Sequence, residues 1–230
     1  MVGRRRGRGL GMSAVVVGVL GLVLAVGAFG WLRSSYGVST VGGDSMRPTY
    51  GKGDRVVWER VDGSQVRRGD VVVFTPPESY GFDAPLMKRV VGVGGDRVRC
   101  CTLVGSRERV TVNGEPIEEP YVYGGDPDGV HQPYDVKVPA GRLFLLGDHR
   151  ANSLDSRFHL DEQGGTVSAD AVLGRVTDDR AVPALLVAAL LLGGVLLLTG
   201  VGLGIGFLAV RRRRAPEMPQ MPWPVQPGGS

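Results

Sequence analysis

Two long stretches without a charged residue constrain this chain more than any other feature. Residues 9–32 carry no formal charge, and Met12–Leu32 is rich in Val, Leu, Ala and Gly. A second uncharged run extends from Ala181 to Val210. A bilayer core takes about 20 apolar residues as a helix, so each run is long enough to span a membrane. The alternative for the first run is a cleavable signal peptide, although its apolar stretch exceeds the roughly 7–15 residues of such segments.

Arginine clusters flank both apolar runs on the side away from the central region. Four arginines precede the first run (Arg4, Arg5, Arg6 and Arg8) and four follow the second (Arg211, Arg212, Arg213 and Arg214). Basic residues beside membrane segments favour the cytoplasmic side, and both clusters can be cytoplasmic only if the chain crosses twice. We therefore expect a cytoplasmic N-terminus over residues 1–11, a span over 12–32, an extracytoplasmic domain over 33–181, a span over 182–210 and a cytoplasmic tail over 211–230. The Pro-rich part of that tail is expected to be extended or disordered.

The central region differs in charge from the whole chain, which carries a net charge of +4. Residues 34–181 hold 18 Lys and Arg against 22 Asp and Glu. The excess positive charge therefore belongs to the arginine clusters, and a basic face for nucleic acid is not indicated. The two cysteines, Cys100 and Cys101, are adjacent. A disulfide between neighbours is strained, so free thiols, a mutual bond and pairing between chains all stay open, while the spacing does not suit a metal site.

The central region is typical of a β-rich domain. Short β-branched and apolar runs alternate with Gly, Asp, Asn and Pro, which is the pattern of strands and turns. Asn113-Gly114 directly follows Val110–Val112 and is a strong hairpin signal. Residues 36–180 contain no long amphipathic helical pattern, and residues 115–141 are irregular. We therefore expect one mainly β domain with a helix at each end, and strands over residues 54–58, 70–74, 87–93, 109–112, 136–138 and 142–146.

The segment Gly42-Gly43-Asp44-Ser45 is the first candidate for chemistry. Glycines before a serine allow the backbone to turn sharply and to approach a substrate. A serine in such a turn can present its hydroxyl while backbone N–H groups stabilise an oxyanion. A tight turn without a catalytic role can have the same sequence. The interpretation of Ser45 as a nucleophile therefore requires a nearby base.

Two kinds of base are available in the central region. Its three histidines leave a Ser-His-Asp triad open: His131, His149 and His159. It has only three lysines against fifteen arginines: Lys52, Lys88 and Lys137. Among these, Lys88 lies in the apolar run Pro85–Val93, and burial lowers the pKa of a lysine, so that a neutral amine can accept a serine proton. The structural alternative is a strand-edge lysine whose ammonium group reaches water.

A polar segment, Gly147–Arg157, follows the apolar run Leu143–Leu146. Its many hydrogen-bonding groups fit either a solvated loop or a network that supports a site. Ser153 and Asp155 have side chains suited to orienting a lysine amine, and Arg157 can pair with an aspartate of the same segment.

Four segments of the chain resemble, in order, the sequence boxes of bacterial type I signal peptidases, which are serine proteases with a Ser-Lys dyad. The four segments are Ser45–Thr49, Arg68–Phe74, Lys88–Gly92 with Gly95-Asp96, and Gly147–Arg157. The resemblance covers about residues 38–177. It implies a signal-peptidase-like β-sheet protease domain, flanked here by an N-terminal and a C-terminal transmembrane helix. It also implies a membrane-bound endopeptidase that needs no cofactor.

The resemblance assigns roles to individual residues. Ser45 would be the nucleophile, Lys88 the general base, and Ser153 would orient the Lys88 amine. Four charged residues would support them: Asp148, Arg150, Asp155 and Arg157. Cleavage would follow small residues of the Ala-x-Ala type, and the pocket candidates are Val41, Met46, Tyr50, Leu86 and Met87. The implied partners are secretory preproteins, the lipid bilayer and the secretion translocon, with the bacterial cell membrane as the location and both termini cytoplasmic.

Two positions depart from the family pattern. Gly43 stands where some members carry a hydroxyl that helps to bind the oxyanion, so the Ser45 backbone N–H would act without it. His149 replaces the usual Asn, which keeps the triad open, although every residue that would serve a lysine is present. Two other functions also stay open: a Ser-Lys protease for pilins or a regulatory precursor, and a catalytically silent β module that binds exported proteins. A self-cleaving repressor does not fit, because the chain has two spans and no DNA-binding segment.

Overall fold

The computed structural model describes residues 3–213, so the predicted Pro-rich tail lies outside the described residues. The chain divides into two compact units. One contains most of the two terminal helices, and the other is Leu32–Pro183. The second unit holds every candidate site residue, and each unit is described by itself.

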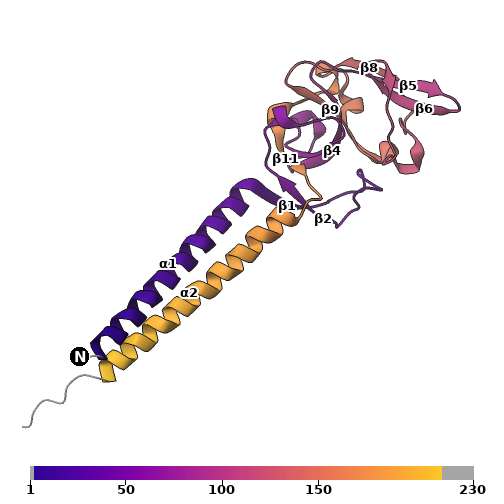
Figure 1. Cartoon of the computed structure of the whole chain (residues 1–230). Helices are drawn as coiled ribbons and strands as arrows, with labels where there is room; N and C mark the ends of the chain where they lie inside the picture. Colours follow the sequence, from indigo (N-terminus) through magenta and orange to yellow (C-terminus); the bar gives the residue numbers. More distant parts are fainter. Residues whose placement is uncertain (1–2, 214–230) are drawn as a thin grey trace, which may run out of the picture. The chain divides into compact units, whose positions relative to one another are not determined.

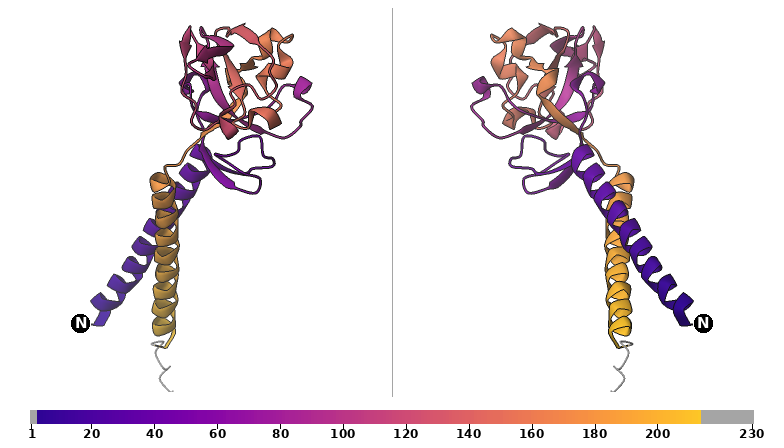
Figure 2. Two further views of the ribbon diagram at one scale, coloured as in Figure 1. Left: turned by 90° about the vertical axis from the view of Figure 1, so that its right-hand side faces the viewer. Right: turned by 90° about the vertical axis from the view of Figure 1, so that its left-hand side faces the viewer.

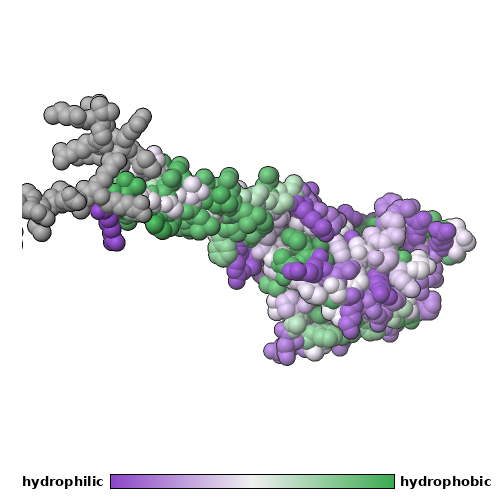
Figure 3. Space-filling view, turned by 90° about the horizontal axis from the view of Figure 1, so that it is seen from below, coloured by the Kyte–Doolittle hydropathy of each residue, from purple (hydrophilic) through white to green (hydrophobic). Residues whose placement is uncertain are grey.

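Two long helices form the first unit (Figure 1). Helix α1 spans Gly3–Ser35 and α2 spans Ala181–Arg213. Their segments Gly11–Ser35 and Ala181–Arg212 are long and apolar enough to cross a membrane, and the face of the described helical residues seen in Figure 3 is mostly hydrophobic. By length and composition, the two helices are therefore candidate membrane spans, as the uncharged runs predicted.

Glycines bring the two helices close together. A side chain at Gly200 of α2 would collide with the backbone of Gly18, and one at Gly21 of α1 would collide with the backbone of Leu197. Small residues at such points let two helical backbones approach closely, which is a common way for helices to associate in membranes. The helices of this unit are thus a packed pair.

The second unit is built on a seven-stranded antiparallel sheet (Figure 1, Figure 2). The order of its strands is β1-β2-β11-β3-β4-β9-β10. The strands are β1 (Tyr36–Thr40), β2 (Arg55–Glu59), β3 (Val71–Phe74), β4 (Leu86–Val93), β9 (Arg142–Leu146), β10 (Val167–Ser168) and β11 (Val172–Val176). Between Tyr36 and Arg180 the helices are only short 3₁₀ turns, which confirms the mainly β prediction.

A smaller sheet has the order β7-β6-β5-β8. Its strands are β5 (Arg97–Val104), β6 (Arg107–Val112), β7 (Glu115–Pro116) and β8 (Tyr134–Lys137). The predicted hairpin is confirmed, because Val112 pairs with Glu115 across Asn113-Gly114. Both turn residues have positive φ, 56° and 87°, as the favoured two-residue hairpin turn requires.

Strands β4 and β9 are covered on both faces. Val90 and Leu145 pack into one hydrophobic cluster, whereas their neighbours Val91 and Phe144 pack into a second cluster with residues of the smaller sheet. Because successive side chains of a strand point to opposite faces, every side chain on the inner part of β4 is buried. The sequence places Lys88 on this strand.

Candidate active site

Ser45 lies in the loop of residues 41–54 between β1 and β2. The buried side chain of Met46 anchors this loop, and the Ser45 carbonyl accepts a hydrogen bond from the His149 N–H at 3.0 Å. At Gly147, any side chain would collide with the Ser45 carbonyl and with Ser153. Glycine at this position therefore lets the segment after β9 approach the Ser45 backbone.

Lys88 is the third residue of β4 and pairs with Val72 of β3. Its side chain is buried, with the residue only 4% exposed, and its Nζ lies 2.8 Å from Ser45 Oγ. Burial lowers the pKa of Lys88 to about 8, while the nearby charge of Asp155 acts in the opposite direction. A neutral amine at hydrogen-bond distance can accept the proton of a serine hydroxyl. The other two lysines of this unit are exposed.

Asp155 and Arg157 form a buried ion pair. The Arg157 guanidinium donates two hydrogen bonds to the Asp155 carboxylate, at 2.8 and 2.9 Å, and the Gly147 N–H donates a third at 3.0 Å. Arg157 also donates to the main-chain oxygens of Arg150 and Asp128. Asp155 is 0% and Arg157 3% exposed. Removal of Arg157 would therefore leave the buried Asp155 carboxylate without its main hydrogen-bonding partner.

A second ion pair connects β4 to the loop of residues 41–54, here called the serine loop. Arg89 donates to both carboxylate oxygens of Asp148, at 2.7 and 2.6 Å. The Asp148 carboxylate also accepts a hydrogen bond from the Thr49 hydroxyl at 2.5 Å. On its other side, the Arg89 guanidinium lies over the ring of Tyr121, 3.8 Å from the ring centroid. Because Thr49 belongs to the loop of residues 41–54, this cluster fixes that loop against β4.

The irregular segment of residues 117–133 supplies contacts that the sequence analysis did not foresee. Its Glu119 carboxylate accepts a hydrogen bond from the buried Arg150 at 2.5 Å, and the Pro127 carbonyl accepts another at 2.5 Å. Tyr121 and Asp128 come from the same segment. The supporting residues expected from the sequence, two arginines and two aspartates, balance in charge, so they did not signal that a further acid such as Glu119 would be needed.

An apolar cavity of about 760 Å³ opens beside Ser45 and Lys88. Four of the five predicted pocket residues line it: Val41, Met46, Leu86 and Met87. Tyr50 lies outside this lining, and its pKa is raised by burial and by the nearby Asp178. Ser153 also lines the cavity, but its buried Oγ has no hydrogen-bond partner among the residues that the structure describes. Sequence reasoning did not propose Phe82 and Phe158, which complete the apolar wall.

Two of the three histidine rings stack on tyrosines, and the third histidine is exposed. The His149 ring stacks on Tyr123, with centroids 4.2 Å apart, and its buried Nδ1 has no hydrogen-bond partner among residues 3–213. The His159 ring stacks on Tyr80 at 4.1 Å, and His131 is exposed. The group in hydrogen-bond contact with Ser45 Oγ is thus the lysine amine.

The β domain thus holds a serine hydroxyl against a buried lysine amine beside an apolar cavity. The family model described as signal peptidase, peptidase S26, matches residues 12–178. The chain therefore belongs to the signal peptidase family, peptidase S26, and is a serine endopeptidase of that family. Membership in this family supports the removal of signal peptides as its activity.

Two relatives in sequence agree with this assignment. The signal peptidase I of Leptolyngbya laminosa is 34% identical over 163 residues, covering 68% of this chain and 72% of that protein. A probable signal peptidase I of Mycobacterium leprae (strain TN) is 31% identical over 188 residues, covering 57% of this chain and 64% of that protein. A solved signal peptidase I from Enterococcus faecalis V583 is 24% identical, covers 49% of this chain and 97% of that chain, and superposes with a TM-score of 0.38.

Proposed function

We propose that this chain removes N-terminal signal peptides from exported preproteins with Ser45 as the nucleophile and Lys88 as the general base. The observation that carries the proposal is the 2.8 Å contact between Lys88 Nζ and Ser45 Oγ. The lowered pKa of Lys88 supports it, since the amine is neutral in a substantial fraction of molecules near pH 8. The apolar cavity next to both groups provides a place for the substrate.

In the proposed reaction, the neutral Lys88 amine accepts the Ser45 proton while Oγ attacks the scissile carbonyl carbon. The resulting ammonium group donates that proton to the leaving amine, and an acyl-enzyme ester forms on Ser45. A water molecule, deprotonated in turn by Lys88, hydrolyses the ester. The Ser153 hydroxyl lines the same cavity and would orient the Lys88 amine. The charged residues of the two ion pairs, with Arg150, would hold these groups in place.

We further propose that the substrate is an extended peptide with small residues at the −1 and −3 positions. Alternate side chains of an extended peptide point to the same side, so both would face the apolar wall of the cavity. Full-length protein in detergent would be given two precursors that differ only in Ala or Leu at −1. We expect cleavage after the Ala, and a rate for the Leu precursor lower by about a hundredfold, since a single methylene group in a hydrophobic pocket already changes the rate by about 10–200-fold. Equal cleavage of both precursors, or cleavage of neither, would contradict this specificity.

For the membrane arrangement, we propose two spans with the β domain outside and both termini cytoplasmic. The support is the position of the arginines in the first turns of α1 and at the end of α2, because basic residues at the ends of a span favour the cytoplasmic side. A bilayer and the secretion translocon are then natural partners, since exported precursors emerge there. Reporter fusions after Arg33 and after Arg214 test this arrangement. A cytoplasmic signal from the first fusion would contradict it.

The cleavage rate should depend on pH through Lys88. Only the neutral amine can accept a proton, so kcat/KM should rise with pH through about 8, the pKa of Lys88, and level off above it. At about pH 6, kcat/KM should be roughly a hundredfold below the plateau, because the neutral fraction falls tenfold for each pH unit below the pKa. Rates measured across this range with one precursor check the prediction. A rise of kcat/KM centred near pH 6.5, the ordinary pKa of histidine, would instead indicate a histidine base.

Adding a hydroxyl at position 43 should raise the rate. A side chain at Gly43 would meet no atom within 4 Å, so serine fits there, two residues before the nucleophile. An extra oxyanion donor can contribute about 10²–10³ in kcat when well placed, and we expect about tenfold from Gly43→Ser. Gly43→Ala is the matched control, because it adds the same Cβ without a donor. Equal kcat for the two variants would contradict the prediction that a hydroxyl at position 43 reaches the oxyanion.

A further inference from the structure

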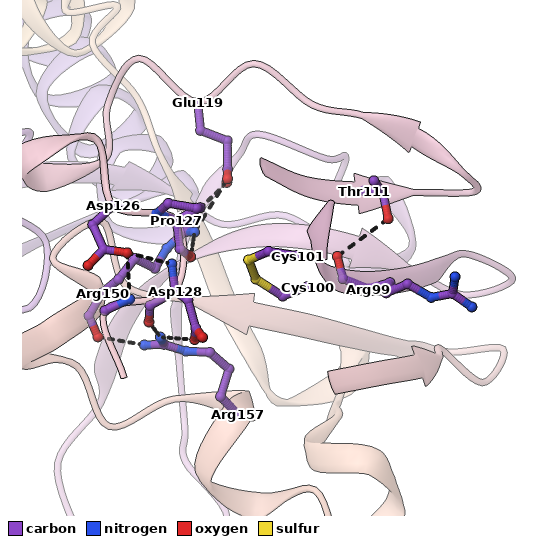
Figure 4. Close-up of a disulfide and its surroundings, with 11 residues drawn as sticks. Arg99, Cys100, Cys101, Thr111, Glu119, Asp126, Pro127, Asp128, Arg150 and Arg157 are labelled. Atoms are coloured by element: carbon purple, nitrogen blue, oxygen red, sulfur yellow. Dashed lines mark hydrogen bonds and ion pairs between the residues drawn. A yellow bond between two sulfur atoms is a disulfide. The ribbon is translucent and has the colours of Figure 1, made fainter. Parts of the chain in front are cut away.

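Cys100 and Cys101 lie at an irregularity of β5. Arg99 pairs with Thr111 and Thr102 with Arg109, so β5 has one residue more than β6 between these pairs, which is a β-bulge. Cys100 is buried, and Cys101 is partly exposed and packs against the same hydrophobic cluster. The structure joins the two cysteines in a disulfide (Figure 4). Of the three states that the sequence left open, it therefore shows the mutual bond.

The disulfide lies beside a buried carboxylate with an unused acceptor. The two sulfur atoms and a carboxylate oxygen of Asp128 lie within 4.8 Å of one another (Figure 4). Asp128 is 4% exposed, and its Oδ1 has no hydrogen-bond partner in the described part of the chain. Arg157 Nη1 lies 3.7 Å from this oxygen. A disulfide carries no proton, so it cannot donate to Oδ1, whereas a thiol can.

Asp128 is also part of the network that reaches Lys88. Its main-chain oxygen accepts a hydrogen bond from Arg157 (Figure 4). Arg157 in turn holds the Asp155 carboxylate through two hydrogen bonds. The charge of Asp155 acts on Lys88. A displacement of Asp128 would therefore be transmitted through one arginine and one carboxylate to the proposed base.

We propose that Cys100–Cys101 is a thiol–disulfide exchange site that controls cleavage, and that its reaction partner is a dithiol reductant. One thiolate of the reductant attacks the sulfur of the partly exposed Cys101, and Cys100 leaves as a thiolate. The second thiol of the reductant then displaces Cys101 from the mixed disulfide. In sum, the bond between the two cysteines breaks, and they gain two electrons and two protons from the dithiol, which becomes a disulfide. This inference rests on the function proposed for Ser45 and Lys88.

The reduced form is the less active one. A new S–H group beside Asp128 donates to its unpartnered Oδ1 and draws the carboxylate away from Arg157. The Arg157–Asp155 pair then loses part of its support, and the Lys88 amine is held less well against Ser45. Reduction should lower kcat by about tenfold, the effect of one weakened hydrogen bond in a buried network, and leave KM unchanged, because neither cysteine lines the substrate cavity.

The experiment compares oxidised and dithiothreitol-reduced full-length protein in detergent, with one Ala-x-Ala precursor and with free thiols counted by alkylation and mass spectrometry. Two double variants distinguish the effect of a new hydrogen-bond donor beside Asp128 from the effect of breaking the disulfide. Cys100→Ala with Cys101→Ala has neither the disulfide nor a donor. Its kcat should equal that of the oxidised protein and should not change when the reductant is added. Cys100→Ser with Cys101→Ser supplies permanent O–H donors, and should be as slow as the reduced protein in either condition.

Several results would overturn the exchange site. The proposal would fail if dithiothreitol left the cysteines oxidised. It would also fail if kcat were the same in oxidised and reduced wild type, or the same in the two double variants. The thermal unfolding midpoint provides a readout that needs no precursor. It should fall on reduction in wild type and fall less in Asp128→Asn, where the carboxylate is absent. An enzyme that cleaves no precursor but shows this pattern would contradict the proposed function and leave the exchange site standing.

Discussion

Replacing Lys88 with methionine should lower kcat for precursor cleavage by about 10²–10⁴-fold, the usual contribution of a general base. Methionine fills a similar volume on β4 but cannot accept a proton, so the fold is retained while the base is lost. The 2.8 Å distance from Lys88 Nζ to Ser45 Oγ makes this amine the group placed to act. The measurement is kcat with an Ala-x-Ala precursor at about pH 9, above the Lys88 pKa of about 8.

Two matched variants make this result specific. Lys52 is exposed on the serine loop, so Lys52→Met should keep the wild-type rate. His149→Ala removes a ring that stacks on Tyr123 and should change kcat by less than about tenfold, since one lost aromatic contact is worth about 0.5–1.5 kcal/mol. Substantial cleavage by Lys88→Met, together with loss of cleavage in His149→Ala, would show that histidine is the base.

Replacing Arg157 with methionine should lower the free energy of unfolding of the β domain by about 3–5 kcal/mol, the cost of leaving one member of a buried ion pair without its partner. Asp155 would remain buried at 0% exposure, with its charge uncompensated. Urea unfolding of the full-length protein in detergent, followed by tryptophan fluorescence, measures the change. Adding Asp155→Asn to Arg157→Met should recover part of the loss, because the uncompensated charge is then gone.

An exposed ion pair of similar geometry provides the control. Arg97 donates two hydrogen bonds to Asp135, at 2.6 and 2.8 Å, but its side chain is 61% exposed. Surface pairs contribute about 0–1 kcal/mol, so Arg97→Met should cost no more than that. Equal losses for Arg157→Met and Arg97→Met would contradict the structural role assigned to the buried pair.

The sequence predicted those parts of the fold and site that depend on local patterns. The uncharged runs predicted α1 and α2, the Asn113-Gly114 pair predicted its hairpin, and the six expected strands form within two residues of their expected ends. The apolar neighbours of Lys88 likewise predicted its burial. The distance between Lys88 and Ser45, in contrast, depends on the packing of the serine loop against β4, and only the family resemblance indicated it.

Features that depend on tertiary contacts were missed. Tyr36–Thr40 has few bulky apolar residues, and Arg97–Val104 is interrupted by charges, so neither resembled a strand before its partners were known. Glu119 and Tyr121 lie in a segment without periodicity, and their contacts with arginines join positions about 30 residues apart. The proximity of the cysteine pair to Asp128 likewise follows from the way this segment packs beside β5.

The most direct test of the proposed activity is the N-terminus of the product released from one precursor by wild-type protein and by Ser45→Ala. Full-length protein in detergent would be incubated with an Ala-x-Ala precursor, and the products would be identified by mass spectrometry. The proposed function predicts one product from the wild type, beginning directly after the second alanine, and none from Ser45→Ala. The same product from Ser45→Ala, or a wild-type product that begins elsewhere, would contradict it.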